Sequence, residues 1–398
     1  MARWFTEHGH DVRVLAAHPY YPRWRLEAPY HRAGWRREEV DGIKTYRCPL
    51  YVPADPTPIL RLVHLLSYAA SSAPIVIWQA MTWKPDIILA IQPTVFAAPA
   101  TALAAVLSGA ASWMHIQDFE VEAAIGAGHV KGGRLPQLGI AMESRIIRMF
   151  DFASTISPTM VQRLGRKAGA VRTRLLPNWV DTEEIVPLTR PSALRAQLGF
   201  ASDDVIALYA GNLGRSQGLE TLVDAARALV GERLRLVIAG DGAVTGEIKS
   251  MSCGLGNVHF LPLQPAERLN ELLNLGDIHL LPRRRGVVDC NMPSKLLNML
   301  ASGRPIVAGA DEGSDVEQVV KSCGIVVAPE DGIAMATAVK RLAGDPLGRA
   351  ALGAAGRNRA ITQWSRDGVL RQFEQCFEEA RSTSRRTPDS PGDRADRK

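Results

Sequence analysis

Short apolar runs alternate along the chain with segments in which apolar residues recur every three or four positions. Runs of four to six apolar residues predict buried strands, and a recurrence of three or four predicts helices that cover them. In the second half, residues 205–210, 234–239 and 278–281 are such runs, with amphipathic segments between them. The repeated order of strand and helix predicts an α/β protein with largely parallel sheets.

The first half of the chain shows the same alternation. Residues 87–91, 112–117 and 152–156 read as strands, and residues 97–107 read as a helix between two of them. By contrast, residues 17–52 are rich in Pro, Tyr and Arg and follow no period, so a long loop is expected there before a strand at its end.

The stretch at residues 287–308, VVDCNMPSKLLNMLASGRPIVA, combines a loop, a helix start and a buried strand. Pro293 suits the first turn of a helix, where the N–H that it lacks has no partner in any case. Ser294 and Lys295 then lie in that first turn. A helix N-terminus offers free N–H groups and a partial positive charge, and Lys295 adds a full one, so the stretch predicts a phosphate-binding site.

A glycine-rich turn, GNLGRSQG, follows the strand at 205–210. A turn of this kind between strand and helix lets the backbone at Gly211, Asn212 and Gly214 approach a diphosphate, and Arg215 supplies a forked donor. Gly240 follows the next strand in the same way. These residues join Ser294 and Lys295 as candidates for donor binding.

In the first half, polar side chains gather just after the strand at 112–117. Gln117, Asp118 and Glu120 lie where ligands bind in open α/β sheets, beyond the carboxyl ends of the strands. His115 lies two residues before Gln117, on the same face of the strand. Asp118 is the stronger candidate for a role in chemistry, and its alternative role is that of a helix cap.

The segment MPSKLLNMLASGRPIVA resembles the donor-binding segment of retaining glycosyltransferases of the GT-B fold, family 4, in the branch that makes colanic acid or other exopolysaccharides. The resemblance implies two Rossmann-like doubly wound domains that face a cleft. It also implies a GDP- or UDP-sugar donor and a polyprenyl-diphosphate-linked or saccharide acceptor. Retention would proceed with the leaving phosphate taking the acceptor proton. Under this resemblance, the candidate catalytic residues are Asp118, Gln117, Arg215 and Lys295.

Three positions depart from the family pattern. Relatives carry two glutamates eight residues apart where this chain has Cys290 and Asn298. Asn298 still offers hydrogen bonds to a ribose hydroxyl, and Asp289 is the candidate substitute for the first glutamate. The lysine usual after the glycine-rich turn aligns with Gln217, which leaves Arg215 as the nearest cation.

The segment PNWVD at residues 177–181 resembles the hinge of the family and sets the expected domain boundary. Apolar residues at one helical face predict a C-terminal helix that crosses back to the first domain, and a polar, proline-containing tail predicts disorder. The expected divisions are an acceptor-side domain at 1–177, a nucleotide-sugar domain at 178–363, the crossing helix at 364–380 and the tail at 381–398.

The beginning of the chain differs from the family pattern. Residues 2–8 read as the end of a helix, Gly9 as its stop and residues 11–16 as a strand. Family members begin with an earlier strand and a glycine-rich loop. We therefore expect that the N-terminal domain lacks its first strand and that an in-frame extension lies upstream of Met1.

Composition narrows the classes of function. The five cysteines are scattered without a C-x-x-C spacing, which argues against a disulfide framework or a zinc site and favours a cytoplasmic protein. There is no Asp-x-Asp pair and no histidine cluster, so no metal and no cofactor are expected.

The net charge of +6 is uneven. Residues 1–180 hold 20 Lys and Arg against 13 Asp and Glu, whereas residues 181–398 hold 27 against 28. A basic first half fits an anionic membrane surface or nucleic acid. Only the charge favours nucleic acid, so a protein peripheral on the inner face of the cytoplasmic membrane is expected. Residues 59–81 lack the uninterrupted apolar length of a span and fit either a membrane-surface helix or a core helix.

Three functions remain open from the sequence. The first is an intact glycosyltransferase that builds a cell-surface polysaccharide. The second is a truncated, inactive paralogue that binds a nucleotide-sugar or glycan. The third is another enzyme of the GT-B fold, such as a sugar-nucleotide epimerase or a phosphorylase.

Overall fold

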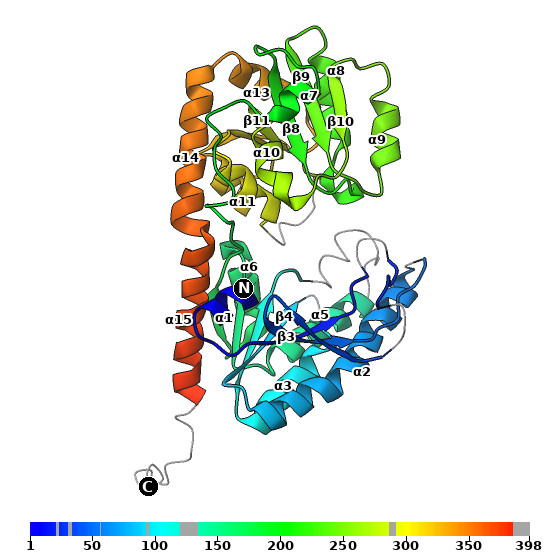
Figure 1. Cartoon of the computed structure of the whole chain (residues 1–398), viewed down its shortest axis with the longest axis vertical. Helices are drawn as coiled ribbons and strands as arrows, with labels where there is room; N and C mark the ends of the chain where they lie inside the picture. Colours follow the sequence, from blue (N-terminus) through cyan, green and yellow to red (C-terminus); the bar gives the residue numbers. More distant parts are fainter. Residues whose placement is uncertain are drawn as a thin grey trace. The chain divides into compact units, whose positions relative to one another are not determined.

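The computed structural model describes residues 1–20, 24–30, 34–55, 57–92, 95–119, 134–285 and 292–384. The chain forms two compact units (Figure 1). The first holds Met1–Ile156, Met160–Leu176 and the chain from Leu370 onward. The second holds Ser157–Thr159 and Pro177–Val369.

Two sheets build the first unit. In one, β1 runs parallel to β3, and β2 pairs with β3 in the antiparallel direction. The other is parallel throughout, in the order β4-β5-β6-β7. Their strands are β1 (Arg13–Ala17), β2 (Arg36–Val40), β3 (Ile43–Cys48), β4 (Ile87–Gln92), β5 (Ala111–Ile116), β6 (Phe152–Thr155) and β7 (Arg172–Leu175).

This arrangement differs from the single doubly wound sheet expected for the N-terminal domain. Strands β1 and β4 do not pair with each other in the described residues, so the strands fall into two sheets. Strand β2 also lies inside the stretch that the sequence assigned to loop, because its RREEV sequence carries no apolar alternation. The absence of a first strand stays a prediction.

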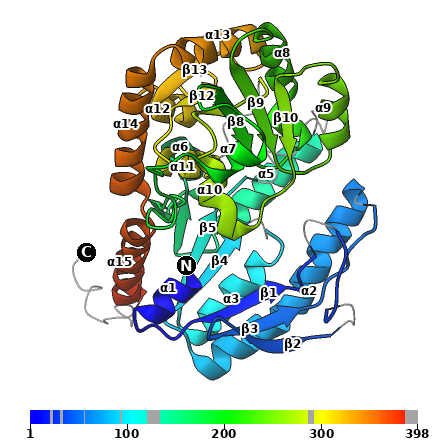
Figure 2. The same ribbon diagram turned by 45° about the horizontal axis from the view of Figure 1, so that its top comes forward.

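The helices of the first unit are α1 (Ala2–Glu7), α2 (Pro58–Trp83), α3 (Ala98–Ser108), α5 (Arg134–Ile147) and most of α6 (Pro158–Ala168). Helix α2 begins at its N-cap Thr57, whose hydroxyl accepts from the N–H of Leu60 at 3.4 Å, and ends where Lys84 turns left-handed. It packs on β1, β3 and α3. Figure 2 shows α2 and α3 side by side.

The second unit holds one parallel sheet of six strands in the order β10-β9-β8-β11-β12-β13. Its strands are β8 (Val205–Ala210), β9 (Leu234–Ala239), β10 (Val258–Leu261), β11 (Ile278–Leu281), β12 (Ile306–Gly309) and β13 (Gly324–Val327). Its helices are α7 (Ala193–Gln197), η1 (Arg215–Gln217), α8 (Glu220–Ala228), α9 (Thr245–Met251), η2 (Ala266–Arg268), α10 (Leu269–Leu273), α11 (Ser294–Ala301), α12 (Asp315–Val320), α13 (Gly332–Ala343) and α14 (Pro346–Trp364).

Burial on both faces explains the continuous apolar run of β8. Ala207 and Tyr209 lie in the core formed with α8 and α13, whereas Ile206 and Leu208 lie in the core formed with α7 and α10. Alternate residues of a strand point to opposite faces, so a strand covered by helices on both sides needs apolar residues at every position.

The last helix, α15 (Arg366–Ser384), begins in the second unit and continues in the first. A bridge between Val180 and Ser365 joins its start to the segment that the sequence identified as a hinge. Further along, Phe373 lies 5.2 Å from the ring of His115. The helix runs four residues beyond the expected end at residue 380; residues 385–398 of the expected tail lie outside the described residues.

Candidate functional site

The order of strands in the second unit marks where a ligand binds. After β10 at one edge, the chain returns to the other side of β8 and lays down β11 there. In parallel α/β sheets, the loops that leave the two strands at such a reversal diverge and leave a crevice at their carboxyl ends. The loop after β8 is the glycine-rich turn, and the loop after β11 leads to α11.

Glycines make the turn after β8 compact. A Cβ atom added to Gly240 would lie 2.0 Å from the carbonyl oxygen of Gly211, and the two residues have φ angles of +139° and +150°. The N–H of Gly211 donates to Ala239 at 3.0 Å. Backbone therefore lies directly on backbone at this end of the sheet, and no residue larger than glycine fits at position 240.

The rest of the turn is equally close-packed. A Cβ on Gly214 would lie 3.1 Å from the side-chain amide of Asn212, and the carbonyl of Asn212 accepts from the hydroxyl of Tyr209 at 2.7 Å. Tyr209 is fully buried, and burial raises its pKa well above the ordinary value. Its hydroxyl therefore stays a neutral donor and fixes the shape of the turn from below.

Lys295 is the cation at the centre of the site. Its ammonium donates to the hydroxyl of Tyr209 at 3.2 Å and to the side-chain carbonyl of Gln217, and it lies 4.6 Å from the Tyr209 ring centroid. A Cβ on Gly211 would lie 3.5 Å from its Cδ. The residues of the glycine-rich turn and the PSK segment, far apart in sequence, thus form one cluster.

The hydrogen-bond partners of the Lys295 ammonium among the described residues are all neutral groups. Burial, with the charge of Arg283 as a second cause, lowers its pKa from 10.5 to about 8. At pH 7 about nine-tenths of the molecules still carry the charge. Lys295 is partly buried and has no carboxylate partner in the described part of the chain, so an incoming anion would stabilise it and the cluster is suited to a phosphate group.

The helix start is arranged as the sequence predicts, with one shift. Pro293 is the N-cap of α11, so Ser294 and Lys295 are its first two residues. Ser294 is exposed and makes no capping bond, and Asn298 is partly exposed one turn further on. Asp289 and Cys290 lie outside the described residues.

Arg215 does not join this cluster. Its side chain is 76% exposed and lies 3.6 Å from the carboxylate of Glu247. The expectation that Arg215 and Lys295 act on one diphosphate is therefore not supported by this arrangement, and the role of Arg215 stays a prediction. Neither the role of Tyr209 nor the contact between Gln217 and Lys295 was predicted from the sequence. For Arg283 a signal was available, because three arginines, Arg283-Arg284-Arg285, follow closely after β11.

In the first unit, the carboxyl end of β5 carries a neutral chain of hydrogen bonds. The hydroxyl of Ser154 lies 2.8 Å from Nδ1 of His115 and accepts from the indole of Trp113 at 2.8 Å. Gln117 lies 2.7 Å from Nε2 of His115. Burial lowers the pKa of His115 to about 4, so the ring is neutral and orients the amide of Gln117.

Asp118 follows Gln117 in the chain, and only part of the hydrogen-bonding capacity of its carboxylate is used by the described residues. Its side chain accepts from the N–H of Phe119, and burial raises its pKa above the ordinary value. Its Oδ1 is buried and has no hydrogen-bond partner in the part of the chain that the structure describes. A buried, underused acceptor is costly for the fold, which favours a functional role over a capping role.

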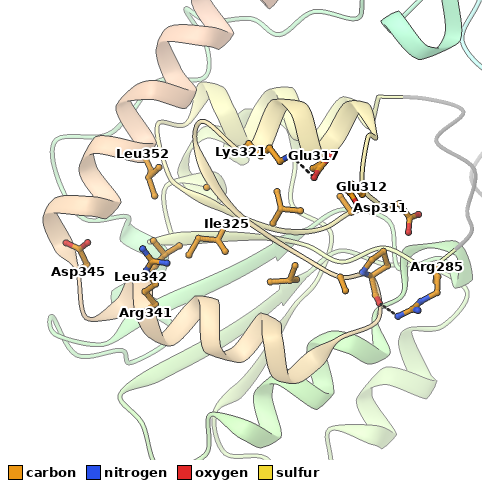
Figure 3. Close-up of a pocket in the computed structure, with 16 residues that line it drawn as sticks. Arg285, Asp311, Glu312, Glu317, Lys321, Ile325, Arg341, Leu342, Asp345 and Leu352 are labelled. Atoms are coloured by element: carbon orange, nitrogen blue, oxygen red, sulfur yellow. Dashed lines mark hydrogen bonds and ion pairs between the residues drawn. The ribbon is translucent and has the colours of Figure 1, made fainter. Parts of the chain in front are cut away.

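A cavity of about 770 Å³ lies elsewhere, along the open edge of β13 (Figure 3). Its walls mix Lys321 and Arg341 with Glu317 and Asp345, and Lys321 already pairs with Glu317 at 2.9 Å. None of the candidate residues lines it. Among the described residues, no group of three or more His, Cys, Asp or Glu side chains is placed to hold a metal ion.

Comparison with known proteins identifies the family. The model described as "Glycosyl transferases group 1" matches residues 204–345, and the model described as "Glycosyl transferase 4-like domain" matches residues 1–179. WcaI, the glycosyl transferase assigned to colanic acid biosynthesis in Escherichia coli (strain K12), is 37% identical over 94% of this chain and 93% of its own length. The chain belongs to glycosyltransferase family 4. Members of this family retain the configuration at the transferred sugar.

Similar solved structures confirm the GT-B fold. A sucrose-phosphate synthase from Thermosynechococcus elongatus matches with a TM-score of 0.74 at 19% identity, over 96% of this chain and 92% of the other. Anabaena HepE in complex with UDP-glucose matches with a TM-score of 0.64 at 18% identity, over 85% and 87%. The GT-B fold and the family assignment that were predicted from the resemblance of the PSK segment are both confirmed.

Proposed function

We propose that this glycosyltransferase moves a sugar, with retention, from a GDP- or UDP-sugar to a polyprenyl-diphosphate-linked or saccharide acceptor in exopolysaccharide synthesis. The main support for the proposal is the partly buried ammonium of Lys295, whose partners among the described residues are the neutral groups of Tyr209 and Gln217 beside the glycine-rich turn. The similarity to WcaI over nearly the whole chain supports the polysaccharide pathway.

The proposed chemistry depends on charge at the leaving group. As the bond between sugar and diphosphate breaks, negative charge grows on the phosphate oxygen that leaves. Lys295 and the free N–H groups at the start of α11 stabilise that charge without rearrangement, because both are fixed before the donor arrives. In the empty site, Lys295 donates hydrogen bonds to Gln217 and Tyr209. When the donor binds, a phosphate oxygen takes the place of these acceptors.

The acceptor hydroxyl attacks from the same face as the leaving group departs, as retention without a covalent intermediate requires. Its proton passes to the leaving phosphate oxygen, so no separate protein base is needed. Asp118 is proposed to accept a hydrogen bond from a sugar hydroxyl, since its Oδ1 is buried and lacks a partner among the described residues.

We further propose that the protein works at the inner face of the cytoplasmic membrane as a peripheral protein. The net charge of +7 in residues 1–180 supports this location, because anionic lipid headgroups attract a basic surface. A lipid-linked acceptor would also be presented there.

A transfer assay tests the proposal. The protein is incubated with a panel of GDP- and UDP-sugars and a polyprenyl-diphosphate-linked saccharide, and both nucleotide release and labelled lipid are measured. We expect turnover with at least one donor and a product whose anomeric configuration is the same as that of the donor. We also expect loss of turnover in Lys295→Met. Donor binding without transfer to any acceptor would favour a binding protein instead, and inverted product would contradict the mechanism.

A further inference from the structure

Helix α2 has an unusual distribution of polar and apolar side chains. Most of its exposed positions follow one helical stripe and are apolar: Ile59, Leu62, Val63, Leu66, Ala70, Pro74, Trp78 and Met81. Arg61 and Thr82 are the exposed polar residues among the described side chains of this helix. Ile59 is 75% exposed and Trp78 is 50% exposed. With a rise of 1.5 Å per residue, the stripe is about 33 Å long. The helix contains no acidic residue.

The inner side of α2 carries the buried polar side chains of the helix. Nδ1 of His64 lies 2.6 Å from the carbonyl of Tyr51, and the hydroxyl of Ser71 donates to the carbonyl of Pro49 at 2.6 Å. A surface helix of a water-soluble protein normally has the opposite arrangement, with its apolar stripe on the core. Helix α2 is therefore inverted relative to that pattern.

The neighbouring helix extends the same surface. Helix α3 packs beside α2, contains no charged residue, and exposes Leu103, Val106 and Leu107. Exposed apolar side chains in this number on two adjacent helices indicate a binding surface. We call the exposed residues of α2 and α3 the apolar face.

Aromatic and basic side chains border the apolar face. The exposed Trp35 donates from its indole to the carbonyl of Ser71 at 2.9 Å, which fixes it beside the middle of α2. Arg61, exposed on α2, lies 5.7 Å from the ring centroid of Trp24, and Lys84 ends the helix. Trp and basic side chains around an apolar surface are typical of helices that lie at a lipid–water interface.

We propose that the apolar face inserts into the surface layer of an anionic lipid bilayer, with α2 parallel to the membrane plane. Charge favours lipid over a second copy of this chain, because residues 1–180 carry +7 and two such regions repel each other. The proposal rests on the membrane location proposed above, and it is independent of the identity of the sugar donor.

The hydrogen bonds of the inner side exclude a crossing orientation. Helix α2 is long and apolar enough to span a bilayer by length and composition, and only 11% of its most apolar window is buried. However, its Gln79 accepts from Arg13 of β1 at 2.8 Å, and its Ser71 is bonded to Pro49. A spanning helix would break these bonds and leave the partners unpaired, so the helix lies flat while it stays packed on the sheets.

Sedimentation with vesicles tests the proposal. The full chain is mixed with neutral phosphatidylcholine vesicles or with vesicles that contain about one quarter phosphatidylglycerol. Each mixture is prepared at about 0.05 M and about 0.5 M salt, because attraction to charged headgroups is screened over this range. We expect preference for the anionic vesicles at low salt and measurable binding that remains at high salt. Binding that high salt abolishes completely would leave only the electrostatic attraction and would overturn the insertion.

Paired variants make the test specific to the apolar face. The variant Leu66→Ser/Trp78→Ser is expected to lower the partition coefficient at least about tenfold at both salt concentrations, since each buried methylene contributes to insertion. The matched control is Leu263→Ser/Leu347→Ser, which removes two exposed apolar side chains from the second unit. Equal binding of both variants would contradict the proposal.

Two further measurements separate the other occupants of the apolar face. Light scattering measures whether the chain is a dimer and whether Leu66→Ser/Trp78→Ser converts it to a monomer. If it does, and if the wild-type chain binds no vesicles, the apolar face belongs to a second copy and the lipid proposal is overturned. Resistance to extraction by alkaline carbonate would indicate a spanning helix and would also overturn it. Donor affinity, measured in parallel, is expected to stay at the wild-type value, so a failure of the donor site is distinguished from a failure of the membrane face.

Discussion

The carboxyl ends of β8 and β5 carry opposite kinds of polar chemistry. At β8, a glycine-rich turn lies beside Lys295, whose partners Tyr209 and Gln217 are neutral. At β5, the neutral ring of His115 orients Gln117, and Asp118 is an acceptor with an unused oxygen in the described structure. The two ends belong to the same kind of parallel sheet.

The same type of sheet edge is thus adapted to two different ligands. In the part of the chain that the structure describes, the end of β8 offers no negative partner to the Lys295 ammonium, so an anion would stabilise it. Among the same residues, the end of β5 offers no donor to Oδ1 of Asp118, so a hydroxyl group would stabilise it. Each end leaves one interaction unmade, and in each the missing partner has the chemistry of one part of a nucleotide-sugar and its acceptor.

The largest expected effect is on the turn after β8. Gly240→Ala places a Cβ 2.0 Å from the carbonyl oxygen of Gly211 at a φ of +139°, so the turn must open. We expect a loss of about 2–4 kcal/mol in the free energy of unfolding, measured with urea, because overpacking and backbone strain add.

The matched control for this substitution is Gly246→Ala in α9. A Cβ at Gly246 meets nothing within 4 Å, and alanine favours a helix, so stability should stay equal or rise by up to about 1 kcal/mol. Similar losses in both variants would show that the glycine-rich turn is not the constrained element.

At β5, Asp118→Asn keeps the shape of the side chain and removes its charge. If Asp118 serves the acceptor or sugar, kcat should fall at least about tenfold, the effect of one charge-assisted hydrogen bond. The pKa of Asp118 is raised in the folded chain, so its charge destabilises the fold above that pKa. The melting temperature at pH 7 should therefore rise as activity falls. A fall in both would assign Asp118 to a capping role.

The pH dependence of donor affinity tests the role of the Lys295 charge at the end of β8. The pKa of Lys295 is about 8 in the empty site, and a bound diphosphate favours the charged form. Above pH 8 the empty site loses its charge, so affinity should fall by up to about tenfold per pH unit. Calorimetry with UDP and GDP between pH 7 and 9.5 measures this fall. In Lys295→Met the affinity should be weaker and nearly independent of pH in that range.

Much of the β8 end could be predicted from the sequence because its signals are local. The run at residues 205–210, the glycines after it and the first turn of the helix with Lys295 each follow from neighbouring residues. The position of Arg215 could not be predicted in this way. It lies in the short 3₁₀ turn η1, where residues advance by about 120° each, so Arg215 and Gln217 point in different directions.

The first unit was less predictable, because its contacts are not local. Whether β1 and β4 pair depends on neighbours far apart in sequence, and no single-strand pattern reports it. The period of α2 predicts a helix with one apolar stripe, but the period alone does not tell whether the stripe faces the core. The answer depends on Gln79 and His64, whose partners lie on β1 and before α2.

The central claim is that Lys295 holds the donor diphosphate, and a calorimetric titration of UDP and GDP tests it most directly. Lys295→Met is compared with Arg215→Met, which removes an exposed cation from the glycine-rich turn. A charge-assisted contact contributes roughly 1.5–3 kcal/mol, so Lys295→Met should weaken binding about 10- to 150-fold. Arg215→Met should weaken it less than about threefold, the usual effect of an exposed pair. Unchanged affinity in Lys295→Met, with both variants folded, would contradict the account.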